Sequence, residues 1–348
     1  MIYGANGYTG RLIAQRAYEL GWKPVLCGRN PSAIAALAAE KNFPYRIADL
    51  ENEIQLLKAL ENIQVVIHAA GPFSKTAKPM IRACLKSGTH YTDITGEIEV
   101  FEMARTFHQQ AINRNILIMP GTGFDVVPTD CLSLYLKNRL PNATSLKIAF
   151  TNTKGSLSHG TATTMISNLG GSGLERANGH LTAVPIGQHQ LNVPFRSGRR
   201  FVMSIPWGDV STAYYTTGIP NIITYTGVSK SLYNALKFQN AFNWILRSKW
   251  FRNIAQRQVD KKIPAGPDAT QRSNSGTMVW AMVENAGGDK KEAELTGPDG
   301  YTMTAETSLL IAGKILAGNT AAGFYTPAGL FGENLIMQVP GVDRIDLQ

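Results

Sequence analysis

Gly4-Ala5-Asn6-Gly7-Tyr8-Thr9-Gly10 is the stretch that decides the fold of this 348-residue chain. It follows the pair Ile2-Tyr3, which is typical of a strand, and precedes residues 11–17, which are typical of a helix. Glycines in such a turn let backbone N–H groups approach a pyrophosphate, which the positive end of the helix dipole stabilises. The stretch therefore predicts a dinucleotide site. The cofactor-binding residues expected in it are Gly4, Asn6, Gly7, Tyr8, Thr9 and Gly10.

A basic residue follows the second predicted strand. Residues 24–27 are typical of a strand, and Gly28-Arg29-Asn30 comes directly after them. NAD-binding proteins usually carry an acidic residue here, which binds the ribose 2′-hydroxyl. A carboxylate would repel a 2′-phosphate and an arginine can pair with it, so Arg29 and Asn30 favour NADP(H) over NAD(H). Taken alone, Arg29 would be read as an exposed surface residue, and it is the preceding glycine turn that gives it this role.

Length and composition are those of a globular protein with two domains. The chain has 44% hydrophobic and 17% charged residues and a net charge of +9, which favours anionic ligands. No nucleic-acid-binding motif accompanies that charge, so we expect a small-molecule substrate and no nucleic acid. Three isolated cysteines predict neither disulfides nor a metal site. Because the glycine turn starts at Gly4 and the chain has no long apolar run, we expect a cytoplasmic protein. We also expect either that the first strand is very short or that further residues precede Met1.

Strand and helix patterns alternate from residue 1 to about 120, at the spacing of βαβ units. This pattern predicts an α/β fold, a Rossmann-type doubly wound parallel sheet whose cofactor lies across the carboxyl ends of the strands. The predicted strands are 2–3, 24–27, 45–48, 65–69, 90–92 and 116–119, and the later helices are 32–41, 53–60, 78–87 and 98–113.

The loops that follow these strands should carry the rest of the site. Asp49 and Leu50 lie where an adenine is commonly contacted, although a helix N-terminus is an equal alternative. The small residues Ala69, Ala70, Gly71 and Pro72 should lie beside the nicotinamide. Three acids in the next two loops are candidates for orienting substrate or transferring a proton, and each could instead cap a helix. They are Asp93, Glu97 and Asp125.

After Asp130 the pattern changes to that of a second, α+β domain with an antiparallel or mixed sheet. We expect the first domain over 1–124, a substrate and dimerisation domain over 125–324, and a segment 325–348 that returns to the first domain. His159 is a candidate proton donor, with a structural histidine as the favoured alternative. Residues 238–252 mix aromatic and basic side chains, which favours a core or subunit-contact helix over one that lies on a membrane surface.

Several stretches resemble the saccharopine dehydrogenase-like oxidoreductases, in particular a shorter bacterial group that includes trans-acting enoyl reductases. The stretches that carry the resemblance are 4–10, Tyr91-Thr92-Asp93-Ile94-Thr95-Gly96-Glu97, residues 120–130, Gly300-Tyr301-Thr302-Met303-Thr304-Ala305 and Gly323-Phe324-Tyr325-Thr326-Pro327-Ala328. The resemblance covers nearly the whole chain. It implies an N-terminal NAD(P) domain, a second domain with substrate and dimer contacts, a homodimer, and pyridine-nucleotide oxidoreduction.

We therefore expect an NADP(H)-dependent oxidoreductase that reduces a C=N, C=O or C=C bond. Residues 156–218 are rich in Thr, Ser, Gly, Met, Pro and aromatic residues, which favours an apolar or lipid-like substrate. Two alternatives stay open: a saccharopine-type amino-acid dehydrogenase, and a non-catalytic protein that binds the dinucleotide as a sensor or interaction partner.

Overall fold

The computed structural model describes residues 1–348 except 154–162, 164–169, 238–242, 247, 264 and 348. The chain divides into two compact units. Unit 1 comprises Met1–Val127 and Gly300–Leu335, and unit 2 comprises Pro128–Asp299 and Ile336–Gln348.

The sheet of unit 1 is wholly parallel. Its strands are β1 (Ile2–Tyr3), β2 (Leu26–Gly28), β3 (Tyr45–Ile47), β4 (Val65–His68), β5 (His90–Asp93), β6 (Leu117–Met119) and β15 (Gly323–Phe324). They lie in the order β15-β6-β5-β4-β1-β2-β3. β1 pairs with both β4 and β2, which is the strand-order reversal of a Rossmann-type sheet. The predicted fold class is confirmed.

Local signals explain where the helices of unit 1 begin and end. They are α1 (Tyr8–Glu19), α2 (Pro31–Lys41), α3 (Glu53–Leu60), α4 (Phe73–Ser87), α5 (Ile98–Arg105), α6 (His108–Asn113), α14 (Gly300–Leu316) and α15 (Pro327–Phe331). The Asn30 side chain caps α2 by accepting the Ala33 N–H, and Asn52 caps α3 in the same way. α4 ends at Gly88, whose φ of 76° is readily adopted only by glycine.

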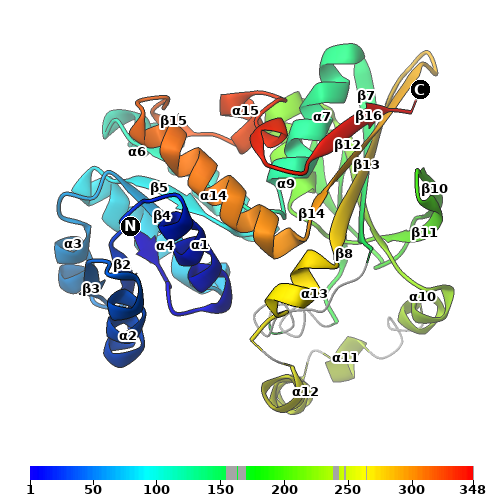
Figure 1. Ribbon diagram of the computed structural model, residues 1–348. Helices are drawn as coiled ribbons and strands as arrows, with labels where there is room; N and C mark the ends of the chain where they lie inside the picture. Colours follow the sequence, from blue (N-terminus) through cyan, green and yellow to red (C-terminus); the bar gives the residue numbers. More distant parts are fainter. Residues whose placement is uncertain (154–162, 164–169, 238–242, 247, 264, 348) are drawn as a thin grey trace. The chain divides into compact units, whose positions relative to one another are not determined.

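Two features of unit 1 differ from the sequence-based expectation. The single helix predicted over 98–113 is divided into α5 and α6, because Thr106 and Phe107 close tight turns on the carbonyls of Met103 and Ala104. α14 and β15, which we had assigned to the second domain, lie in unit 1. α14 contacts α1, β4 and β5 (Figure 1), and β15 adds a seventh strand beside β6.

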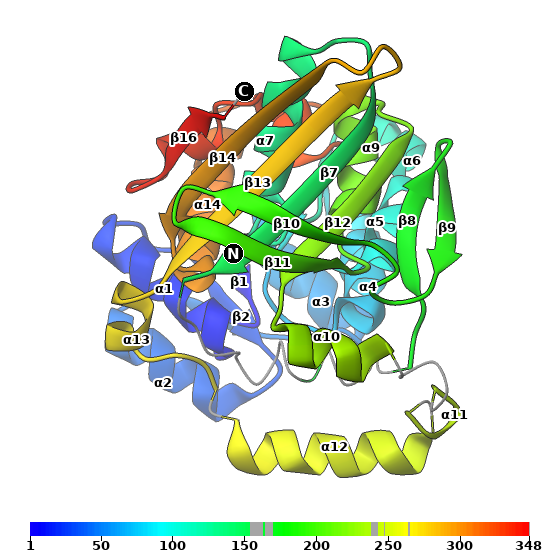
Figure 2. The ribbon, with the colours of Figure 1, turned by 90° about the vertical axis from the view of Figure 1, so that its right-hand side faces the viewer.

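Unit 2 contains a mixed sheet. Its strands are β7 (Ala143–Asn152), β8 (Gly173–Ala177), β9 (His180–Val184), β10 (Gln190–Phe195), β11 (Gly198–Ser204), β12 (Asn221–Gly227), β13 (Gly276–Asn285), β14 (Lys290–Pro298) and β16 (Asp343–Asp346). The order is β10-β11-β12-β7-β13-β14-β16, with the β8–β9 hairpin attached to β12 (Figure 2). β12 and β7 are parallel and their neighbours antiparallel. We expected the segment 325–348 to return to the first domain. Residues 325–335 lie in unit 1, whereas residues 336–348, with β16, lie in unit 2.

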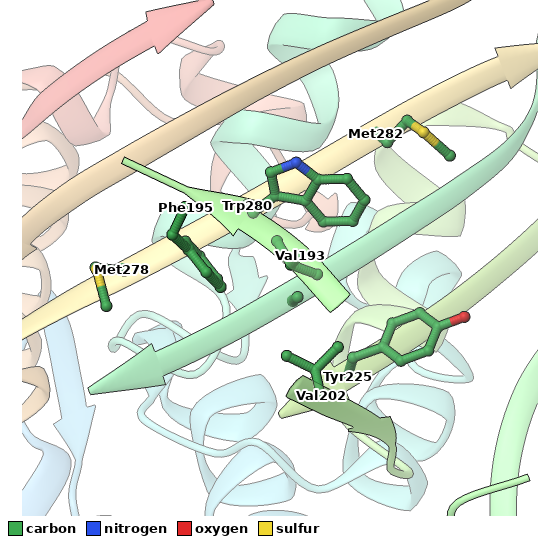
Figure 3. Close-up of a cluster of buried hydrophobic side chains, with 8 residues drawn as sticks. Val193, Phe195, Val202, Tyr225, Met278, Trp280 and Met282 are labelled. Carbon is green, nitrogen blue, oxygen red and sulfur yellow. The ribbon is translucent and has the colours of Figure 1, made fainter. Parts of the chain in front are cut away.

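One face of the unit 2 sheet carries a buried hydrophobic cluster (Figure 3). Val193 and Phe195 come from β10, and Trp280 lies on β13 between Met278 and Met282. The Trp280 indole N–H donates to the Glu292 carboxylate at 3.1 Å, which satisfies the one polar group of that side chain. Ala149 of β7, Val202 of β11 and Tyr225 of β12 complete the cluster.

Unit 2 also contains helices, which connect the strands of its sheet. They are α7 (Val127–Arg139), α9 (Asp209–Thr217), α10 (Lys230–Lys237), α11 (Asn243–Leu246), α12 (Lys249–Lys262) and α13 (Ala269–Ser273), with a 3₁₀ turn at Ile336–Gln338. In the part of the chain that the structure describes, no helix is long and apolar enough to cross a bilayer.

Candidate functional site

The glycine turn after β1 is packed so tightly that no side chain fits at Gly4 or Gly10. Gly4 has a φ of 82°, and its N–H donates to the Cys27 carbonyl at 2.8 Å. A Cβ on Gly4 would lie 2.8 Å from the backbone nitrogen of Ala70, and one on Gly10 would lie 2.3 Å from the Gly4 oxygen. Glycine is therefore needed at Gly4 for both conformation and space, and at Gly10 for the close approach of α1 to the turn.

The N-terminus of α1 is suited to an anion. Gly7 is its N-cap and is exposed, no side chain caps the helix, and the first turn contains no acid. First-turn N–H groups have no acceptor within their own helix, so the helix end attracts negative charge. A pyrophosphate fits this position. Tyr8, the first helical residue, packs edge-on against Tyr301 of α14, with ring centroids 5.1 Å apart.

Arg29 is placed as a phosphate-binding residue would be. It directly follows β2, is exposed, and makes no hydrogen bond or ion pair within the described chain. Asn30, the neighbouring candidate, uses its side-chain oxygen to cap α2. Arg29 is the better placed of the two for a ribose 2′-phosphate, because its guanidinium has no competing partner there.

The loop after β4 lies against the glycine turn. The Ala69 N–H donates to the Tyr3 carbonyl at 2.8 Å, and Ala70 is the residue that a side chain on Gly4 would strike. Gly71 and Pro72 continue this loop to α4 and are exposed. The structure thus brings together the two loops that we assigned to the cofactor from the sequence.

Asp49 and Leu50 have local roles. One Asp49 carboxylate oxygen accepts the Glu51 N–H at 3.0 Å, and its carbonyl accepts the Asn52 N–H at 3.1 Å. These bonds form the turn into α3, which favours the helix-terminus alternative. Leu50 lines a cavity of about 660 Å³ whose other walls come from α3, α4 and α6.

Asp93 ties together the loops at the carboxyl ends of β5 and β6. Its buried carboxylate accepts the Tyr91 hydroxyl at 2.5 Å and the N–H groups of Thr95 and Gly121 at 3.0 and 2.9 Å. Burial raises the pKa of Asp93 to about 6, while these hydrogen bonds act in the opposite direction. This set of contacts favours a structural role.

Glu97 caps α4. Its carboxylate oxygens accept the Phe73 and Ser74 N–H groups at 2.9 and 2.8 Å. Two donors from the first turn of a helix, together with the helix dipole, stabilise a negative charge there. Glu97 therefore links the loop after β5 to the start of the helix that follows the nicotinamide-side loop.

Asp125 lies close to the loop that follows β5. Its carboxylate packs on Gly96, where an added Cβ would lie 2.7 Å from an Asp125 oxygen. Burial raises the pKa of Asp125 to about 7, which is suitable for gaining and losing a proton near neutrality. His159, the remaining candidate, lies outside the described residues.

Sequence reasoning missed two contributions to this edge of the sheet. α14 holds the β6–α7 loop, since Thr307 donates to the Thr122 carbonyl at 2.7 Å and Thr304 accepts the Phe124 N–H at 3.0 Å. Thr304 lies in the stretch 300–305, one of those that carry the family resemblance, and this stretch was the sequence signal that could have pointed to α14. His68, the last residue of β4, is fully buried beside the rings of Tyr3, Phe73 and Tyr91, and no signal marked it.

Comparison with known proteins supports an NADP-binding N-terminal domain. Residues 1–119 match the saccharopine dehydrogenase NADP binding domain. A trans-acting enoyl reductase of Mycobacterium ulcerans is 28% identical over 160 residues, which cover 44% of this chain and 38% of that protein. A human saccharopine dehydrogenase-like oxidoreductase is 25% identical over 160 residues, or 40% of this chain and 37% of the relative. The matched stretch thus spans little more than a third of these relatives.

The similarity to known structures extends beyond the N-terminal domain. The structure of apo saccharopine dehydrogenase (L-Glu forming) from Saccharomyces cerevisiae matches with a TM-score of 0.67 over 100% of this chain and 99% of the other, at 12% sequence identity. That likeness concerns the fold alone. The match over residues 1–119 shows that the N-terminal part of this chain is a domain of the saccharopine dehydrogenase NADP-binding type, with NADP(H) as its cofactor.

Proposed function

We propose that this protein transfers hydride between NADP(H) and a C=N, C=O or C=C bond of a small-molecule substrate. The observation that carries the proposal is the glycine turn at the N-terminus of α1, with Arg29 at the end of β2 making no hydrogen bond or ion pair to any residue that the structure describes. The cofactor supplies the hydride, and the protein supplies binding, orientation and a proton.

Asp125 is the group we assign to proton transfer. Asp125 combines a pKa of about 7 with a position against Gly96, in the loop that follows β5. A group that titrates near the working pH can both give and take a proton efficiently. Asp125 would donate a proton to the atom left negative after hydride addition.

An α,β-unsaturated, apolar substrate is the class we favour. Curated relatives include enzymes named trans-acting enoyl reductases, whose name describes reduction of a C=C bond. The composition of residues 156–218 also fits a mainly apolar substrate. Enoyl thioesters are therefore the first compounds to assay.

Cofactor choice is tested by titrating the protein with NADPH and NADH. We expect tighter binding of NADPH, and a loss of about ten- to a hundredfold in Arg29→Ala, because a charge-assisted phosphate contact is worth about 1.5–3 kcal/mol. NADH binding should change little. Arg82→Ala, which removes an exposed arginine from α4, is the matched control. Equal NADPH affinity in wild type and Arg29→Ala would remove Arg29 from the site.

Catalysis is tested by following NADPH oxidation with enoyl thioesters, aldehydes and amino-acid imines. Turnover of the thioesters, reduced about a hundredfold or more in Asp125→Asn with NADPH affinity retained, is the expected result. Turnover confined to amino-acid imines would instead identify an amino-acid dehydrogenase. Tight NADPH binding with no turnover of any compound would favour a nucleotide sensor.

A further inference from the structure

The positive charge of this protein is concentrated in one segment. Residues 230–262 contain eight Lys or Arg and a single acid, Asp260, which gives a net charge of +7, against +9 for the whole chain. The segment includes α10, α11 and α12 of unit 2. The remaining residues are therefore close to neutral in sum, and one region accounts for the basic character of the protein.

Large apolar side chains in the same segment face solvent. Trp244 of α11 and Trp250 of α12 are 75% and 70% exposed, and Ile254 is 39% exposed. The sequence analysis favoured a core or subunit-contact helix for residues 238–252. Within the chain, neither tryptophan lies in a core, and residues 238–242 and 247 are outside the described part.

The two faces of α12 differ. Residues three or four apart lie on one side of a helix, so Trp250, Ile254, Arg257 and Lys261 form a single stripe, and all four are exposed. We call this stripe the α12 face. The opposite side is attached to the protein: Val259 is buried, and Gln256 donates to the Thr163 hydroxyl at 3.0 Å. α11, with Trp244, contacts α12 (Figure 2).

We infer that the α12 face and Trp244 bind the surface of a bilayer that contains anionic phospholipid. Tryptophan favours the boundary between headgroups and acyl chains, and basic side chains bind anionic headgroups. A second copy of this chain is a poor occupant, because two segments of net charge +7 would repel each other. This inference does not depend on the proposed oxidoreductase activity.

Vesicle flotation with the full-length chain tests the inference. We expect the protein to bind vesicles of phosphatidylcholine with phosphatidylserine, and to bind phosphatidylcholine alone far more weakly. Adding the mixed vesicles should shift the tryptophan emission to shorter wavelength, because the two exposed indoles leave water. Raising the salt concentration should weaken binding, as screening predicts.

Two pairs of substitutions separate the apolar from the basic contribution. Arg257→Gln with Lys261→Gln should lower vesicle affinity about thirtyfold at low salt, since two basic contacts are lost. Trp250→Ser with Ile254→Ser should lower it about tenfold or more and remove part of the emission shift. Lys290→Gln with Lys291→Gln removes the same charge from exposed residues of β14 and should bind nearly as wild type.

Three results would overturn the inference. Equal affinity of the wild type for neutral and mixed vesicles would show that the positive charge has no role. Equal losses in the Arg257/Lys261 and Lys290/Lys291 pairs would show that net charge matters and the α12 face does not. Concentration-dependent dimers that dissociate in Trp250→Ser, with no vesicle binding, would identify a second copy of the chain as the occupant.

Discussion

Acid should destabilise this protein through one buried imidazole. His68 is fully buried at the end of β4, and neither ring nitrogen has a hydrogen-bond partner among the described residues. Burial lowers the pKa of His68 from 6.5 to about 3. Below pH 6.5 the unfolded chain therefore binds a proton at this residue that the folded protein does not bind. The folded state loses stability as pH falls from 6.5 towards 3.

The size of the effect follows from the gap between the two pKa values. Each pH unit below 6.5 costs about 1.4 kcal/mol until the folded-state pKa is reached, so the loss at about pH 4.5 is about 3 kcal/mol. His68→Leu removes the titrating group at similar volume. At pH 7 it should be near wild type in stability, because losing ring contacts to Tyr3, Phe73 and Tyr91 opposes the gain from removing two unsatisfied nitrogens.

Urea denaturation of both proteins at pH 7 and at about pH 4.5 measures this effect. The difference in free energy of unfolding between His68→Leu and wild type should shift by about 3 kcal/mol in favour of the variant at the lower pH. Asp93 and Asp125 have raised pKa values and contribute in the opposite direction, but both proteins contain them, so their terms cancel. His180→Leu, which removes an exposed histidine from β9, is the control. The same difference at both pH values would refute the reasoning.

Two further substitutions test the packing of the site. Gly4→Ala combines an unfavourable positive φ with a collision at Ala70. It should abolish NADPH binding and lower the free energy of unfolding by about 2–4 kcal/mol. The control is Gly21→Ala, which has a φ of 74° and no neighbour within 4 Å and should lower the free energy of unfolding by only about 1 kcal/mol. Glu97→Gln keeps one acceptor oxygen but loses the charge at the α4 N-terminus. The free energy of unfolding, measured with heat or urea, should therefore fall by about 1–2 kcal/mol. A loss of turnover without this destabilisation would instead indicate a catalytic role.

Local rules were sufficient for most of unit 1. Buried runs such as Val65–His68 and capped helices such as α2 carry their signals within a few residues, so periodicity and capping predicted them. β15 could not be predicted in this way. It has two residues, and it forms only because its backbone pairs with β6, about two hundred residues earlier in the chain. A strand defined by a distant partner has no local signature.

The distinction between local signals and contacts with distant residues also applies to the candidate site. The glycine turn was predictable because the conformation and the close packing both depend on residues of the motif itself and the next strand. The acids were not, because a carboxylate is equally suited to a cap and to proton transfer. The role of Glu97 is defined by the two N–H groups that it accepts from Phe73 and Ser74, which only the tertiary structure brings near.

The division of the chain between the units has a consequence for synthesis on the ribosome. Unit 1 is interrupted after Val127 and resumes at Gly300, so α14, β15 and α15 are translated last of its elements. At about 5–20 residues per second, β6 waits roughly 10–40 s for the strand that covers its outer edge. An unpaired edge strand is a template for pairing with other chains. This edge of β6 therefore has no β15 to pair with until residue 324 has been synthesised, which is after most of unit 2 has been translated.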